Sequence, residues 1–192
     1  MLPKDLLFYN GTGGFTTDGK EYKIVTGKNR TTPAPWVNVI ANRDMGTVIS
    51  ESGSAYTWCI NAHEYRLTPW SNDPVTDAGG EAFYLRDEES GHFWSPTPFP
   101  VGSASPYIAT HGFGYSSFQH DEQGISTEMF VFVDSNLPVK LDAVKNKKSV
   151  GPSTQALRHR LPGNYPWRRR KQNGHAYCIR TGYRKRSAAF YE

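Results

Sequence analysis

The sequence predicts an all-β protein in which antiparallel sheets pack face to face. Aromatic residues make up 14% of the 192 residues, and short aromatic-rich runs are separated by many of the 18 glycines and 13 prolines, as is typical of strands joined by turns. The clearest run, residues 125–133, alternates with period two and has apolar side chains on both faces, which indicates a strand between two packed layers. No helical stripe of comparable length precedes residue 140, so the sheets must bury these faces against one another.

The earlier strands follow from the same alternation and from the turn residues between them. The turn Thr17-Asp18-Gly19 precedes the first strand, Asn42-Arg43-Asp44 separates a hairpin pair, and the turn-forming run at 87–91 separates another. In chain order, the expected strands cover residues 22–26, 36–41, 47–50, 55–60, 82–86, 92–95, 107–110 and 115–120.

Two long segments, residues 61–80 and 95–106, are rich in Pro, Asn, Asp and Ser and are expected to be loops. Long ordered loops on a sandwich often carry function, and the first is the more polar and aromatic. Its amides, carboxylates, Arg and Trp suit contact with a sugar or with another domain, although such groups also satisfy a loop's own backbone. The candidate carbohydrate-binding or active-site-facing residues are Asn61, Glu64, Arg66, Trp70, Asn72 and Asp73.

Other motifs favour ordinary structure over chemistry. The run Asn10-Gly11-Thr12-Gly13-Gly14 lacks the strand-then-helix context of a phosphate loop and is interpreted as a flexible turn. The carboxylates of Asp87, Glu88 and Glu89 fall together in a hairpin turn, where solvated charges are common. No histidine or cysteine has metal-ligand spacing, so we expect no metal and no cofactor, and no catalytic residue is predicted.

The charge of the chain changes abruptly near residue 143. Residues 1–142 hold nine Lys and Arg against seventeen Asp and Glu, whereas residues 143–192 hold thirteen Lys and Arg against Glu192 alone. A compact domain rarely changes character so sharply, so the chain is expected to consist of a sandwich at 1–144 and a basic tail at 145–192. There is no 18-residue apolar run, no signal-peptide pattern at the start and only two cysteines, so we expect a cytoplasmic location.

Several long motifs, in order, resemble the start of a glycoside hydrolase family 94 module (glycosyltransferase family 36, cellobiose phosphorylase-like). They are NGTGGFTTDGKEY, TPAPWVNVIAN, SESGSAYTWCINAHEYRLTPWSNDPV, GEAFYLRDEESGHFWSPTPFP and HGFGYSSFQHDEQGIS. The resemblance covers about residues 5–144. It is strongest to the module at the C-terminal end of cyclic β-1,2-glucan synthases, above all in NAHEYRLTPW and YLRDEESGHFWSPTP.

This resemblance implies a large two-sheet antiparallel β-supersandwich, galactose mutarotase-like, that precedes an (α/α)₆ barrel. The family cleaves or forms β-glucosides with inorganic phosphate as co-substrate, and a barrel Asp acts as general acid. No residue of this chain matches that Asp, so we expect a truncated, inactive fragment of a glycoside phosphorylase or glycosyltransferase. The implied partners are a β-glucan or gluco-oligosaccharide, the missing barrel and a second copy in a homodimer. The parent enzyme is expected to attach to the inner membrane, although this chain has no membrane segment.

The tail does not resemble the family and is expected to be a frameshifted, non-native and disordered segment. Read one nucleotide later, the codons permitted for residues 155–191 allow a family-like peptide containing LGEDANKTAMH. The rival interpretation is a nucleic-acid-binding tail led by Trp167-Arg168-Arg169-Arg170-Lys171. Charge runs of this kind are usually solvated, so no nucleic-acid partner is expected. A third interpretation, an independent carbohydrate-binding module, predicts glucan affinity without the barrel.

Overall fold

The computed structural model describes residues 5–148 except 71, 72, 74, 78, 88 and 89, together with the strands at 155–159, 169–171 and 176–182. Strands and turns make up this part of the chain, and no helix in it is long and apolar enough to cross a membrane. The strands are β1 (Gly13–Phe15), β2 (Glu21–Thr26), β3 (Val37–Ala41), β4 (Met45–Ser50), β5 (Ala55–Cys59), β6 (Phe83–Asp87), β7 (Phe93–Trp94), β8 (Tyr107–Gly112), β9 (Tyr115–Glu122), β10 (Ile125–Val133), β11 (Val139–Lys148), β12 (Gln155–His159), β13 (Arg169–Lys171) and β14 (Ala176–Gly182).

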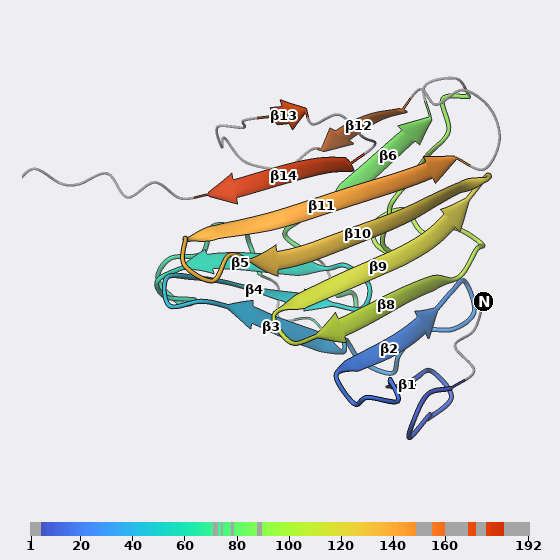
Figure 1. Cartoon of the computed structure of the whole chain (residues 1–192), viewed down its shortest axis with the longest axis horizontal. Helices are drawn as coiled ribbons and strands as arrows, with labels where there is room; N and C mark the ends of the chain where they lie inside the picture. Colours follow the sequence, from blue (N-terminus) through green and yellow to red (C-terminus); the bar gives the residue numbers. More distant parts are fainter. Residues whose placement is uncertain are drawn as a thin grey trace, which may run out of the picture.

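An antiparallel sheet forms the front layer in Figure 1, in the order β1-β2-β8-β9-β10-β11-β14-β13. Its inner face is organised by one row of side chains that stand side by side across five strands. In register, this row consists of Ile24, Ala109, Phe118, Met129 and Val144, each at most 1% exposed. Such a row removes apolar surface from water at every strand and therefore fixes the pairing register.

Two three-stranded sheets, β3-β4-β5 and β12-β6-β7, make the second layer. Ile40 and Ile49 come from the first of these sheets, and Leu85 and Trp94 come from the second. All four join the inner row of the large sheet in one hydrophobic core. The architecture is thus an all-β supersandwich of packed antiparallel sheets, which confirms the fold class predicted from the sequence.

All nine predicted strands are present, with ends that differ by at most two residues, and β10 has the predicted bounds. The faces of β10 differ from the prediction, however. Met129 and Val131 are fully buried, whereas Phe130 and Phe132 on the other face are only half-buried. Phe130 lies 6.4 Å from the ring of Tyr115 on the neighbouring strand, so these aromatic side chains pack along the sheet surface and not beneath a second layer.

Five described strands were not predicted: β1, β11, β12, β13 and β14. β1 begins at the end of the glycine-rich run interpreted as a flexible turn, where Asn10 accepts hydrogen bonds from the backbone of Thr12 and Gly13. β11 pairs along the whole length of β10 and extends past the expected boundary at residue 144. Beyond it, β14 pairs with β11 and β12 pairs with β6. The frameshift and the 1–144 boundary remain predictions.

Candidate functional site

The predicted loop 61–80 lies along the free β5 edge of the three-stranded sheet β3-β4-β5. The amides of Leu67 and Thr68 donate to the Thr57 carbonyl, and the Gly80 amide donates to Ala55. Arg66 forms an isolated backbone bridge with Trp58. These bonds extend the outer edge of β5, so the loop is held against a rigid strand instead of projecting freely into solvent.

Loop and strand together build an aromatic surface, here called the aromatic platform, from Tyr56, Trp58, Arg66 and Trp70. The Trp70 ring stacks on Tyr56 at 5.3 Å, and Tyr56 in turn lies 5.5 Å from Trp58. The Arg66 guanidinium lies 5.5 Å from the centre of the Trp70 ring, within the range of a cation–π contact. Trp70 remains 46% exposed, so the stacked rings are available to a ligand.

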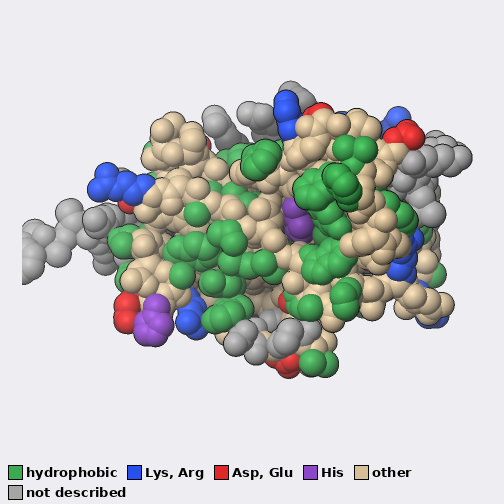
Figure 2. Space-filling view, turned by 90° about the horizontal axis from the view of Figure 1, so that it is seen from below, with side chains coloured by type: hydrophobic (Ala, Val, Ile, Leu, Met, Phe, Trp, Pro, Cys, Tyr) green, Lys and Arg blue, Asp and Glu red, His purple; other side chains and the backbone are tan. Residues whose placement is uncertain are grey.

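The position of Trp58 depends on a glycine beneath it. Gly46 pairs with Trp58 across β4 and β5, and a Cβ added at Gly46 would lie 2.2 Å from Trp58 Cζ2. No larger residue fits without moving the indole. From Tyr56 the apolar surface continues across the sheet β3-β4-β5 through Val48 and Val39. Val39 is 61% exposed. In the view from below (Figure 2), hydrophobic side chains gather over the middle of the molecule, and charged side chains lie mostly toward the rim.

The structure brings Arg66 and Trp70 together, but three other predicted residues serve local turns. Asn61 accepts hydrogen bonds from the amides of His63 and Glu64, and the Glu64 carboxylate pairs with the His63 ring at 2.6 Å. Asp73 accepts bonds from the hydroxyl and amide of Thr76, and the hydroxyl contact lowers the pKa of Asp73. These contacts match turn chemistry. The sixth predicted residue, Asn72, lies outside the described residues.

Tyr56 and Trp58 were missed by the sequence reasoning, although a signal for them exists. They are two positions apart in a predicted strand and therefore share one face. Only the way the loop folds back on β5 shows that this face meets Trp70 and not the core.

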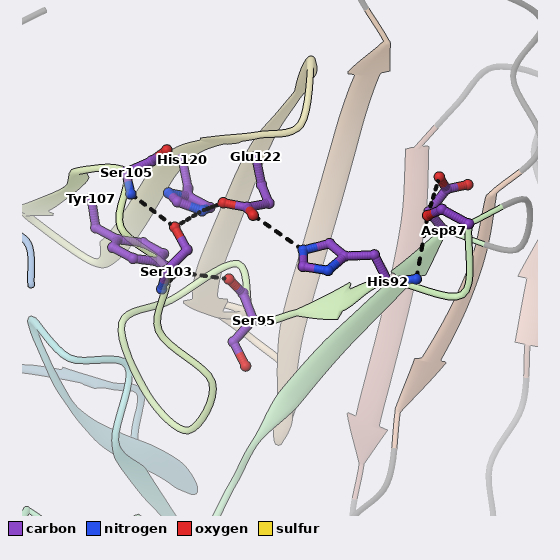
Figure 3. A network of polar contacts seen from close by, with 9 residues as sticks. Asp87, His92, Ser95, Ser103, Ser105, Tyr107, His120 and Glu122 are labelled. Atoms are coloured by element: carbon purple, nitrogen blue, oxygen red, sulfur yellow. Dashed lines mark hydrogen bonds and ion pairs between the residues drawn. The ribbon is translucent and has the colours of Figure 1, made fainter.

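A polar network joins the second predicted loop, 95–106, to the large sheet (Figure 3). Glu122 lies between two imidazoles, 3.1 Å from His92 Nε2 and 3.5 Å from His120 Nε2. Ser103 Oγ lies 3.1 Å from the same His120 nitrogen. Burial opposes ionisation of Glu122, but its hydrogen bonds with Ser103 and His92 outweigh this and lower its pKa. The network therefore anchors the loop through an ionised carboxylate.

The geometry of this network excludes a serine–histidine–acid relay. In such a relay the acid holds the imidazole nitrogen remote from the serine. Here His120 Nδ1 donates to the Pro106 carbonyl at 3.2 Å, and both Ser103 and Glu122 approach Nε2. The His120 ring also stacks on Tyr107 at 3.7 Å, and burial lowers its pKa. His120 is thus a buried structural anchor.

A second charged cluster lies inside the sandwich. Lys140, which is 1% exposed, forms an ion pair with Glu81 Oε2, and the hydroxyls of Thr57 and Thr68 donate to Glu81 Oε1. Asp142 lies 3.7 Å from the same ammonium, and burial raises its pKa to about 7. Burial also opposes the ionisation of Glu81, but Lys140 and the two hydroxyls outweigh it, so the pKa of Glu81 is lowered. This cluster is enclosed by the sheets and offers nothing to a ligand.

The packed antiparallel sheets around one hydrophobic core define a β-supersandwich. Residues 20–149 match the family model for the supersandwich domain of glycosyl hydrolase family 94, and the chain belongs to this family.

Three relatives show how the chain relates to whole enzymes. It is 39% identical over 148 residues to the cyclic beta-(1,2)-glucan synthase NdvB of Rhizobium meliloti (strain 1021), covering 76% of this chain and 5% of the synthase. It is 36% identical over 125 residues to the N,N'-diacetylchitobiose phosphorylase of Vibrio proteolyticus, covering 63% and 15%. It is 33% identical over 135 residues to the solabiose phosphorylase of Paenibacillus borealis, covering 68% and 17%. The chain therefore spans a small part of each relative's length.

Proposed function

We propose that this chain serves as the non-catalytic sandwich module of a β-glucan synthase or glycoside phosphorylase and that the aromatic platform contacts the glucan. The catalytic general acid, the inorganic phosphate and the barrel that holds them belong to the parent enzyme. The name of the most similar of the three relatives favours a β-1,2-linked glucan as the ligand. The proposal also includes that the parent enzyme is a homodimer.

The observation that carries the proposal is the exposed stack of Trp70 on Tyr56 beside Arg66. A pyranose ring has apolar C–H faces that pack on aromatic rings, and its hydroxyls accept hydrogen bonds from a guanidinium. Arg66 Nε already donates to the Ala62 carbonyl at 2.8 Å. The remaining guanidinium donors are thus held in place near the indole, which reduces the entropy lost when a ligand binds.

The test is a calorimetric titration of the 192-residue chain with linear β-1,2-gluco-oligosaccharides, with N,N'-diacetylchitobiose as a comparison ligand. Trp70→Ala should weaken oligosaccharide binding about tenfold or more, because an aromatic anchor of this kind contributes on the order of 1–3 kcal/mol. Phe113→Ala is the matched control, because Phe113 is 85% exposed and lies between β8 and β9, outside the platform. Failure of the unsubstituted 192-residue chain to bind the oligosaccharides would refute the proposal. Equal affinities for Trp70→Ala and the unsubstituted chain would refute it as well.

A further inference from the structure

A cavity of about 520 Å³ opens at one end of the sandwich, where the last residue of β2 meets loops from both layers. Thr26 and Tyr107, which are paired neighbours in the large sheet, line it from one side. Glu51 and Ser52, at the turn after β4, line it from the other side. Its volume lies within the range of roughly 300–1,000 Å³ typical of small-molecule sites.

One wall of the cavity contains an unsatisfied hydroxyl. Thr26 is 6% exposed, and its Oγ1 has no hydrogen-bond partner among the residues that the structure describes. Buried hydroxyls in folded proteins are nearly always bonded, so a ligand group that reaches Thr26 Oγ1 gains a hydrogen bond for which the described residues supply no partner. The hydroxyl can donate one hydrogen bond and accept others.

Two carboxylates in the same cavity are already fixed by the protein. Asp77 Oδ2 accepts hydrogen bonds from Ser50 at 2.8 Å and Ser52 at 2.5 Å, whereas Oδ1 makes none with the described residues. Glu51 accepts from the Trp36 amide at 2.7 Å and from the Thr32 hydroxyl. An ionised carboxylate has about four acceptor positions, so both groups keep capacity for ligand hydroxyls.

The lining also indicates the chemical class of the ligand. Lys28 is the only basic residue among the lining residues, against two carboxylates, so an anion such as phosphate is disfavoured. Pro33, Pro35 and Pro98 add apolar C–H surface. Acceptor groups, hydroxyls and apolar patches without excess positive charge fit a neutral, hydroxyl-rich molecule.

We propose that this cavity is a second sugar-binding site, which takes a glucosyl unit at the end of a β-glucan chain. The identity of the sugar rests on the proposed function, but the site is separate from the aromatic platform. The same loop supplies both sites: residues 61–80 place Trp70 in the platform and Val75 and Asp77 in the cavity wall. A disaccharide is expected to occupy the cavity alone, so it distinguishes the cavity from the platform.

The test compares two isosteric variants of the full 192-residue chain, titrated with sophorose, the β-1,2-linked glucose disaccharide. Thr26→Val should lower sophorose affinity about three- to tenfold, as expected for one lost hydrogen bond, without lowering the thermal midpoint. Thr127→Val is the matched control: Thr127 is 3% exposed and its hydroxyl also lacks a described partner, but it lines a different cavity. This control should bind sophorose as tightly as the unsubstituted chain does. Inorganic phosphate should bind neither to the unsubstituted chain nor to either threonine variant.

A third variant, Ala34→Phe, fills the cavity from an exposed position and should abolish sophorose binding even if Thr26→Val fails to fold. Equal affinities for Ala34→Phe and the parent chain, or equal losses in both threonine variants, would overturn the proposal. The platform is tested separately, because Trp70→Ala should weaken binding of long oligosaccharides but leave sophorose affinity intact. Loss of sophorose binding in Trp70→Ala alone would support the platform and refute the cavity.

Discussion

Asp142 makes the sandwich sensitive to pH in a direction opposite to that of most acidic residues. Its carboxyl is 2% exposed and its Oδ1 has no hydrogen-bond partner among the described residues. Burial raises its pKa from 3.8 to about 7. The unfolded chain releases this proton near pH 4, whereas the folded chain retains it, so stability falls as the pH rises from about 4 to 7.

The size of this effect follows from the shift. A difference of roughly three pKa units corresponds to about 4 kcal/mol of unfolding free energy that is lost once the pH exceeds 7. Asp142→Asn keeps the size of the side chain and removes the ionisation. The variant and the parent chain should therefore be similarly stable near pH 4, and the variant should gain up to about 4 kcal/mol relative to the parent by pH 8.

The assay is urea unfolding at intervals from pH 4.5 to 8.5, with the difference in unfolding free energy plotted against pH. Titrating groups that do not interact with Asp142, including the buried His111 and His120 with lowered pKa values, are common to both proteins and cancel in the difference. Asp121→Asn is the control for the loss of a carboxylate, because Asp121 is exposed on the outer face of β9. A flat line for Asp142→Asn, or a variant less stable than the parent at pH 8, would refute the reasoning.

Two further predictions concern the platform and the chemistry. Gly46→Ala should destabilise the chain by roughly 1–3 kcal/mol in urea unfolding, because the added Cβ would overlap the Trp58 indole. Gly27→Ala is the control and should be nearly neutral, because its Cβ would come no closer than 3.9 Å to its nearest neighbour. The 192-residue chain should release no glucose 1-phosphate from β-1,2-gluco-oligosaccharides and phosphate in a coupled assay, because the proposed general acid belongs to the barrel; turnover above background by the purified chain would contradict the assignment of catalysis to the barrel.

The strand pattern was readable from the sequence wherever apolar residues marked the buried face. β10 is the best example, because Ile125, Met129 and Val131 all point into the core. β11 escaped prediction because its inward positions include Lys140, Asp142 and Asn146, whereas Leu141 and Ala143 lie on the more exposed face. The hydrophobic alternation is therefore inverted. The burial of Lys140 is stabilised by Glu81, which lies 59 residues away in the chain. No local sequence pattern reveals this contact.

The candidate site was predictable to a similar extent. Composition pointed to the loop that contributes to the aromatic platform, and two of its proposed residues, Arg66 and Trp70, lie together. Asn61 and Asp73 have the same residue types as sugar ligands, but their oxygens are used in local turns. Thr26 could not be found from sequence, because an unpartnered hydroxyl is a property of the packed environment and not of the residue type.

The tail provides the last prediction, which is that residues beyond about 144 are read in the wrong frame. The family match ends at residue 149, and the basic excess begins at Lys145; similarity to relatives and charge are unrelated properties, yet they change at nearly the same place. A basic tail selected for function explains the charge, but gives no reason why the next frame permits a family-like peptide. The codon for Trp167, for instance, forces a glycine at its junction with Arg168 in that frame. Sequencing the gene decides the matter: read one base later, it should encode a segment similar to LGEDANKTAMH and stay open past the codon for Glu192. A stop codon in that frame before that point, or an unrelated peptide, would show that the tail is genuine.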